Sequence, residues 1–150
     1  MLKGLDPILG PDLLWVLAAM GHGDDLAIVD ANHPAERIAA ATVSRRIVRL
    51  PGLTMPRAVR AILSVLPIDD FEPEPIRRMS VVGDADAVPA VQQEVQAEII
   101  RVLGRDVVPT GIDRYAFYAA AAQGFAVVQV GDPRPYGCFL IRKGIITGAM

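Results

Sequence analysis

Apolar residues recur every three or four positions in several segments of the chain, which is the spacing of one face of an α-helix. The clearest case runs from Pro11 to Met20, with proline at a first-turn position and Gly21 ending the segment. Spacing and capping signals also predict helices over residues 54–66, 89–103 and 113–123, and a short alanine-rich helix or turn over 34–41. Helical segments therefore recur along the whole chain.

Short apolar runs separate these helices and predict strands. Residues 26–29 include no polar side chain, which is typical of a strand covered on both faces, and Asp30 follows at its carboxyl end. Further strands are predicted at 46–50, 76–82, 107–108, 125–130 and 137–141, and the acidic, proline-rich stretch 67–75 is predicted to be an exposed connection. Alternating strands and helices predict one α/β domain over residues 1–150, a three-layer α/β/α arrangement with a largely parallel sheet. Such sheets bind ligands at the carboxyl ends of their strands, where Asp30 lies.

Composition narrows the range of partners. The chain has 150 residues, of which 52% are hydrophobic, and a formal charge of −2 from 15 basic and 17 acidic residues. Because acidic and basic residues are nearly equal in number, the protein has no strong electrostatic field. Neither nucleic acid nor an anionic membrane surface is therefore an expected partner, and a small neutral molecule fits better. The lone Cys138 excludes an intrachain disulfide, and neither a signal-peptide core nor an apolar run long enough to span a membrane is found. We therefore expect a cytoplasmic protein.

Both histidines flank the predicted strand 26–29. His22 lies between two glycines, which leave its ring approachable, and Asp24 and Asp30 are near in sequence. This group fits an acid/base site, a metal site formed with His33, or a solvated polar loop. The spacing of the two histidines matches no common zinc pattern, so we expect no metal.

Two further segments combine aromatic and polar side chains. Residues 113–118 hold Arg114 and Tyr118 at a predicted helix start, and residues 133–138 place Tyr136 in a proline-stiffened turn before Gly137. Aromatic rings cover the apolar faces of sugars, while guanidinium and hydroxyl groups hydrogen-bond to sugar oxygens. Both segments fit sugar recognition, although the first could be core packing and the second a hairpin-like connection.

Over nearly its whole length the chain resembles the ribose pyranase and fucose mutarotase (RbsD/FucU) family, and the fucose branch in particular. The resemblance rests on segments whose order and spacing agree with that branch: Met1-Leu2-Lys3, Leu14 through Met20-Gly21-His22-Gly23-Asp24, Asp30-Ala31, Pro34-Ala35, Arg114-Tyr115-Ala116-Phe117-Tyr118, Tyr136-Gly137 and Leu140-Ile141-Arg142-Lys143-Gly144. The family pattern has asparagine where this chain has Cys138, and a thiol cannot replace both the donor and the acceptor of an amide.

The resemblance implies an isomerase that interconverts the α and β anomers of a free monosaccharide without a cofactor. It implies His22 as the catalytic proton donor, with substrate-binding positions at Asp30, Arg114 and Tyr136-Gly137-Cys138. We add Asp24, as a carboxylate that could hold His22, and Tyr118 as further candidates. Arginine at position 114 is similar to the fucose branch and favours a fucose-like sugar.

The resemblance also implies a ring-shaped homo-oligomer, a decamer in characterised branches, with sites completed across subunit contacts. Two other function classes stay open. A non-catalytic sugar-binding or transport-accessory protein would use Asp30 and Arg114 without needing an acid at His22. A metal-dependent isomerase or hydrolase would need His22, His33 and a carboxylate to converge on one ion.

Overall fold

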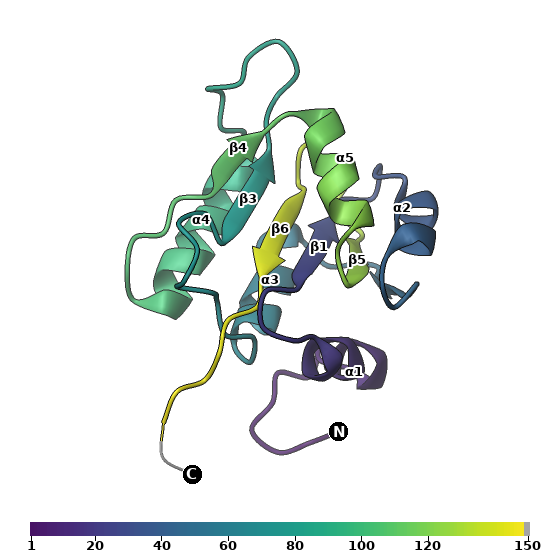
Figure 1. The fold of residues 1–150 in the computed structure, drawn as a ribbon, viewed down its shortest axis with the longest axis vertical. Coiled ribbons are helices and arrows are strands. Elements are labelled where there is room, and N and C mark those ends of the chain that lie inside the picture. The colour runs from purple at the N-terminus through teal and green to yellow at the C-terminus, as the bar shows by residue number, and fades with distance from the viewer. Residues whose placement is uncertain (149–150) are drawn as a thin grey trace.

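A six-stranded mixed sheet forms the centre of the computed structural model, which describes residues 1–148. Its strand order is β2-β5-β1-β6-β3-β4 (Figure 1). The strands are β1 (Asp25–Val29), β2 (Ile47–Leu50), β3 (Ile76–Met79), β4 (Thr110–Ile112), β5 (Ala126–Val130) and β6 (Phe139–Arg142). β6 runs antiparallel to both of its neighbours, and every other pairing is parallel. The predicted α/β class and largely parallel sheet are confirmed.

Five helices cover the two faces of this sheet and complete three layers (Figure 1). Apolar side chains of α1, α3 and α4 share one buried cluster with one face of the sheet, and those of α2 and α5 share a second cluster with the other face. The helices are α1 (Pro11–Ala19), α2 (Ala35–Ala41), α3 (Met55–Leu63), α4 (Ala90–Leu103) and α5 (Arg114–Ala122). Among residues 1–148, no helix has the length and apolar character to cross a lipid bilayer.

The sequence of β1 explains why this strand lies in the centre of the sheet, between the two layers of helices. Leu26 and Ile28 enter the cluster beneath α1, α3 and α4, whereas Ala27 and Val29 enter the cluster beneath α2 and α5. All four side chains are fully buried. Successive side chains of a strand point to opposite faces, so a strand between two helical layers must be apolar at every position.

Three expectations about strands need correction. The predicted strand at residues 107–108 is wrong, because the strand of this region is the three-residue edge strand β4. The strand predicted over 76–82 ends at Met79. The turn before β6 is not a hairpin, because β1 lies between β5 and β6 in the sheet. The chain therefore crosses the end of β1 before it enters β6, and this crossing brings residues 136–138 to Asp30.

Candidate functional site

Asp30 lies at the carboxyl end of β1, as its sequence position predicted, and it is the centre of a buried cluster there. Its carboxylate accepts a hydrogen bond from Gly137 N at 3.1 Å, one from Cys138 Sγ at 3.4 Å and one from Asn32 N at 2.9 Å. Burial raises the pKa of the Asp30 carboxyl, and these hydrogen bonds oppose the shift only in part. Burial also raises the pKa of the Cys138 thiol, so its S–H is available to donate to Asp30.

Tyr136 is held in an uncommon backbone conformation beside this cluster. Its φ of 65° lies in the left-handed region, a backbone conformation that costs energy for residues other than glycine. Gln92 Nε2 donates to the Tyr136 carbonyl at 2.9 Å, and the Tyr136 hydroxyl accepts the Val82 N–H at 3.3 Å. Such strain concentrates at functional sites, where the surrounding contacts hold a side chain in one orientation. The phenol ring of Tyr136 is therefore fixed near the same edge of the sheet.

Arg114 lies at the start of α5, which follows the carboxyl end of β4. Asp113 caps this helix by accepting the Tyr115 N–H at 3.0 Å and the Ala116 N–H at 3.1 Å. The Arg114 Nε donates to the Tyr118 hydroxyl at 2.9 Å, and this hydrogen bond raises the pKa of Arg114. The helix cap thus presents an exposed, charged guanidinium beside an aromatic ring.

Two surface cavities flank these residues. One, of about 450 Å³, includes Arg114 in its lining, and the other, of about 430 Å³, includes Tyr136. Both also include Val81, which follows β3. Each volume is large enough for a small ligand. Of the candidate binding residues, Arg114 and Tyr136 therefore meet open space, at the sheet edge where β1, β3 and β4 end and β6 begins.

His33 belongs to this cluster, although its sequence context gave little sign of it. Its Nδ1 lies 3.7 Å from Cys138 Sγ, and its ring packs edge-on against Phe117 and Tyr118 at centroid distances of 5.8 and 5.3 Å. Burial lowers the pKa of His33 to about 4, so the ring is neutral at pH 7. His33 connects the Asp30 cluster to the Arg114–Tyr118 pair, because it contacts Cys138 on one side and Tyr118 on the other.

His22 lies at the other end of β1 from Asp30. Five strand residues separate the two loops, a length of about 16 Å at about 3.3 Å per residue. The Nε2 atom of the exposed imidazole lies 3.1 Å from Asp69 Oδ1, within hydrogen-bond distance, and the ring packs against Phe71 at a centroid distance of 5.1 Å. The structure therefore does not bring His22 and Asp30 of one chain together.

The expectation that Asp24 holds His22 is wrong. The Asp24 carboxylate accepts the Gly21 N–H at 2.7 Å, and Asp69 is the carboxylate that contacts the imidazole. Asp69 belongs to the stretch 67–75, which was expected to be an exposed connection, yet it is buried. The only local signal was the apolar Ile68 before it, and one apolar residue does not predict a buried carboxylate.

His22, His33 and a shared carboxylate do not converge on one point, because the two histidines belong to opposite ends of β1. Across residues 1–148, no group of three or more His, Cys, Asp or Glu side chains has the arrangement of a metal site.

Comparison with known proteins places this arrangement in a family. The family model for the RbsD/FucU transport protein family matches residues 3–146. The chain belongs to this family. An L-fucose mutarotase of Histophilus somni is 35% identical over 145 residues, which is 97% of each chain.

Solved structures of family members share the fold closely. The fucose mutarotase of Streptococcus pneumoniae, solved in complex with L-fucose, is 28% identical and aligns with a TM-score of 0.86 over 97% of this chain and 100% of that one. FucU of Bifidobacterium longum is 32% identical, with a TM-score of 0.87 over the same shares. This chain thus shares its fold with a relative that was solved in complex with L-fucose.

Proposed function

We propose that this family member is a monosaccharide mutarotase that interconverts the α and β anomers of a fucose-like sugar. One observation carries the proposal: Asp30, Arg114 and residues 136–138 gather at one sheet edge beside open cavities, in a chain related throughout its length to L-fucose mutarotases. A carboxylate, a guanidinium and aromatic rings supply the hydrogen bonds and the apolar contact that a sugar ring requires.

The reaction needs only proton transfer. A proton is delivered to the ring oxygen and another is removed from the anomeric hydroxyl, so the bond between the anomeric carbon and the ring oxygen breaks and an aldehyde forms. Rotation about the adjoining carbon–carbon bond and reclosure on the other face give the second anomer. Positioned acid/base groups contribute about 10²–10⁴-fold to such steps, and holding the sugar contributes more.

His22 is the proton donor in this proposal, and it acts on a sugar bound by a second copy of the chain. Two observations support action across a subunit contact. His22 and Asp30 lie at opposite ends of β1, and the imidazole is 43% exposed on the outer surface beside Phe71, which is itself 66% exposed. We propose that the chain forms a homo-oligomeric ring, specifically a decamer. In this ring the surface around His22 of one subunit would contact the surface around Arg114 and Tyr136 of the next.

At the sheet edge that holds the candidate binding residues, Arg114 donates hydrogen bonds to sugar hydroxyls, and the rings of Tyr118 and Tyr136 orient the sugar. Cys138 contributes through its backbone, because its thiol is buried against Asp30 and His33. Asp30 holds residues 136–138 at the end of β1 through its hydrogen bonds with Gly137 and Cys138. It is itself a substrate-binding residue in this proposal. We further propose a cytoplasmic location, which the single free thiol of Cys138 supports.

Exchange NMR on anomerically equilibrated L-fucose, D-ribose, D-galactose and D-glucose with catalytic amounts of protein tests the activity. We expect faster anomer exchange for L-fucose than for D-ribose, and loss of exchange in His22→Ala with an unchanged fold. Absence of exchange for all four sugars would refute the mutarotase assignment.

Mixing two inactive variants tests the shared site. We would dissociate and reassociate His22→Ala with Arg114→Ala in equal amounts, at a sugar concentration where each alone is inactive. If one chain supplies His22 and another supplies Arg114, about one quarter of the sites in random mixtures are intact, so about one quarter of wild-type activity returns. A tag on one variant verifies that mixed oligomers form. Mixed oligomers without activity would show that the site is not shared.

A second function has one observation in its favour, because the family model carries the description of a transport protein family. A transport-accessory protein would bind the sugar at the Arg114 edge and have no need of an acid at His22. Saturable sugar binding without anomer exchange, unaffected by His22→Ala, would favour this function.

A further inference from the structure

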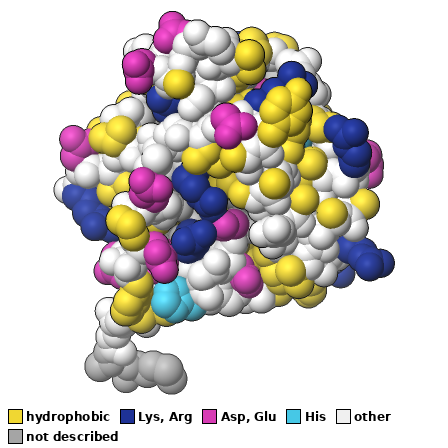
Figure 2. Space-filling model, turned by 45° about the horizontal axis from the view of Figure 1, so that its top comes forward, with side chains coloured by type: hydrophobic (Ala, Val, Ile, Leu, Met, Phe, Trp, Pro, Cys, Tyr) yellow, Lys and Arg dark blue, Asp and Glu magenta, His cyan; other side chains and the backbone are white. Residues whose placement is uncertain are grey.

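A buried carboxylate lies directly behind the exposed imidazole of His22. Asp69 is 1% exposed and His22 is 43% exposed, and Asp69 Oδ1 is 3.1 Å from His22 Nε2. Figure 2 shows a histidine side chain at the lower edge of one face of the molecule, beside acidic and basic groups. The imidazole therefore has one nitrogen directed at the protein interior and the other available to a ligand.

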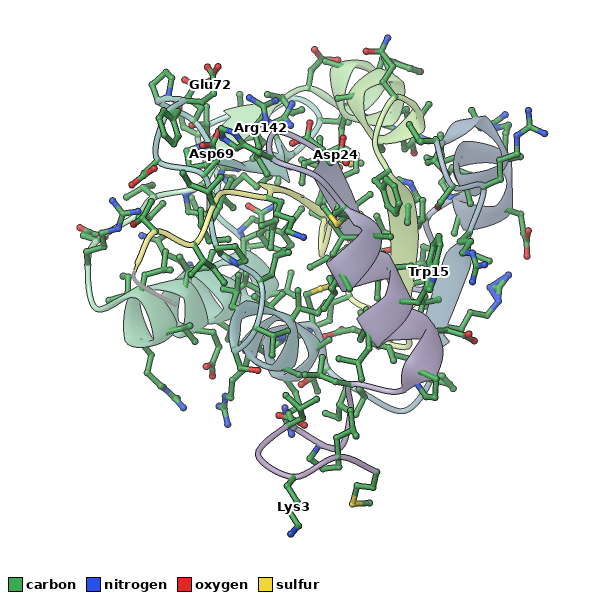
Figure 3. All side chains as sticks on the ribbon, turned by 60° about the horizontal axis from the view of Figure 1, so that its bottom comes forward. Lys3, Trp15, Asp24, Asp69, Glu72 and Arg142 are labelled. Carbon is green, nitrogen blue, oxygen red and sulfur yellow. The ribbon has the colours of Figure 1, made fainter. Side chains whose placement is uncertain are left out.

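The backbone around Asp69 is held in several ways. The Asp69 N–H donates to the Arg142 carbonyl at 3.0 Å, and Ile68 forms a β-bridge with Lys143. Gly144 permits this contact, since a Cβ at that position would lie 2.4 Å from the Ile68 carbonyl oxygen. Figure 3 shows Asp69 beside Arg142. The backbone of Asp69 is thereby fixed to the end of β6.

The charge state of Asp69 determines which nitrogen of His22 carries the proton. Burial acts to raise the pKa of Asp69, but hydrogen bonds from the Phe71 N–H and from His22 outweigh it and bring the pKa below its ordinary value. An ionised carboxylate has no proton to donate, so the hydrogen in the 3.1 Å contact belongs to His22 Nε2. Neutral His22 then has a bare Nδ1.

Phe71 restricts the imidazole further. Its ring lies 5.1 Å from the imidazole centroid at an interplanar angle of 56°. The peptide N–H of the same residue donates to Asp69 Oδ1 at 3.1 Å, so ring and carboxylate are positioned by one short segment. A ring held at Nε2 and packed on one side has a defined orientation for Nδ1.

We propose that Asp69 is a positioning residue for the acid step, an inference that rests on the proposed mutarotase function. It holds the proton on Nε2 and thereby makes Nδ1 the atom that exchanges a proton with the sugar. In the step itself, protonated Nδ1 gives its proton to the ring oxygen, and the neutral imidazole that remains keeps its Nε2–H on Asp69. The carboxylate stabilises the imidazolium without accepting its proton.

Asp69→Asn tests this role, with Asp70→Asn as the matched control. Asp70 is the next residue, is exposed, and undergoes the same change of charge. The side-chain amide that replaces the Asp69 carboxylate can donate to Nε2, which moves the imidazole proton to Nδ1. We expect kcat to fall by about 10²-fold for Asp69→Asn with KM changed less than about twofold, and both constants to stay near wild type for Asp70→Asn.

Magic-angle-spinning NMR of ¹⁵N-histidine-labelled protein reads the tautomer directly. The chain has two histidines, and His22→Gln assigns their signals. We expect protonated Nε2 and bare Nδ1 for neutral His22 in the wild type, and the reverse in Asp69→Asn.

Three outcomes would overturn the proposal: a protonated Nδ1 in the wild type, wild-type kcat in Asp69→Asn, or an equal loss in Asp70→Asn. The wild-type tautomer needs no variant, so it decides the case even if Asp69→Asn fails to fold. Failure of the proposed function gives a different pattern, in which the wild type itself exchanges no sugar anomers whatever its tautomer.

Discussion

His33 makes the stability of this protein depend on pH in a way that one substitution can remove. The ring is buried, its Nε2 has no hydrogen-bond partner among residues 1–148, and burial lowers its pKa from an ordinary 6.5 to about 4. Between those values the unfolded chain binds a proton that the folded chain does not, so stability falls as pH falls through this window. The loss between pH 8 and pH 5 amounts to about 2 kcal/mol for this residue.

Phenylalanine is the appropriate replacement, because the neighbours of the imidazole are the aromatic rings of Phe117 and Tyr118. His33→Phe keeps a planar ring of similar size and gives up only the 3.7 Å contact with Cys138 Sγ. We expect its stability at pH 8 to be within about 1 kcal/mol of wild type. At pH 5 the variant should be the more stable of the two proteins by about 1–3 kcal/mol.

Urea unfolding at pH 8 and pH 5, at one fixed protein concentration, measures this difference. The fixed concentration matters because association of subunits also stabilises the folded state. A loss of about 2 kcal/mol corresponds to a fall of about 1 M in the urea midpoint if the slope is about 2 kcal/mol/M. The reasoning would be refuted if wild type and His33→Phe showed the same change between the two pH values, or if an NMR titration gave His33 an ordinary pKa.

Two further substitutions test contacts that hold the loops of the site. Gly144→Ala should lower the free energy of unfolding by about 1–3 kcal/mol, since the new Cβ would lie 2.4 Å from the Ile68 carbonyl oxygen, and chemical denaturation measures this; an unchanged midpoint would contradict the tight packing. Asp132 pairs with Arg134 and accepts the Met55 N–H, and the Arg134 hydrogen bond is the main cause that lowers its pKa to about 2. This stabilises the fold by about 2 kcal/mol above about pH 4, an effect lost as pH falls through about 2. Asp132→Asn should therefore cost at least that much at pH 7 and little near pH 2, and equal costs at both pH values would argue against the ion pair.

Local patterns in the sequence determined the main elements and part of the binding edge. The unbroken apolar run of β1 requires cover on both faces, and Asp30 marks the point where that run ends. Asp113 before an apolar segment predicts a helix start, and α5 begins there with Asp113 as its cap. These predictions succeed because alternation and capping depend on residues a few positions apart.

The tertiary structure alone decided which loops meet. Strand order puts β1 between β5 and β6, and this brings Gly137 to Asp30 although the two are 107 positions apart in sequence. The edge strand β4 has three residues, too few to show alternation, and it is defined by pairing with β3. Pairing depends on the summed packing of distant segments, which no short window of sequence contains.

The same reason explains Asp69 and His22. An acidic, proline-rich stretch is typical of an exposed connection. Asp69 is nevertheless buried, because its segment pairs with the end of β6, where the Arg142 carbonyl accepts the Asp69 N–H. The glycine neighbours of His22 indicated an approachable side chain, and the resemblance to the RbsD/FucU family implied its role as a proton donor. Its carboxylate partner and its separation from Asp30 by the length of β1 follow from the packed sheet, because both depend on which segments lie side by side in space.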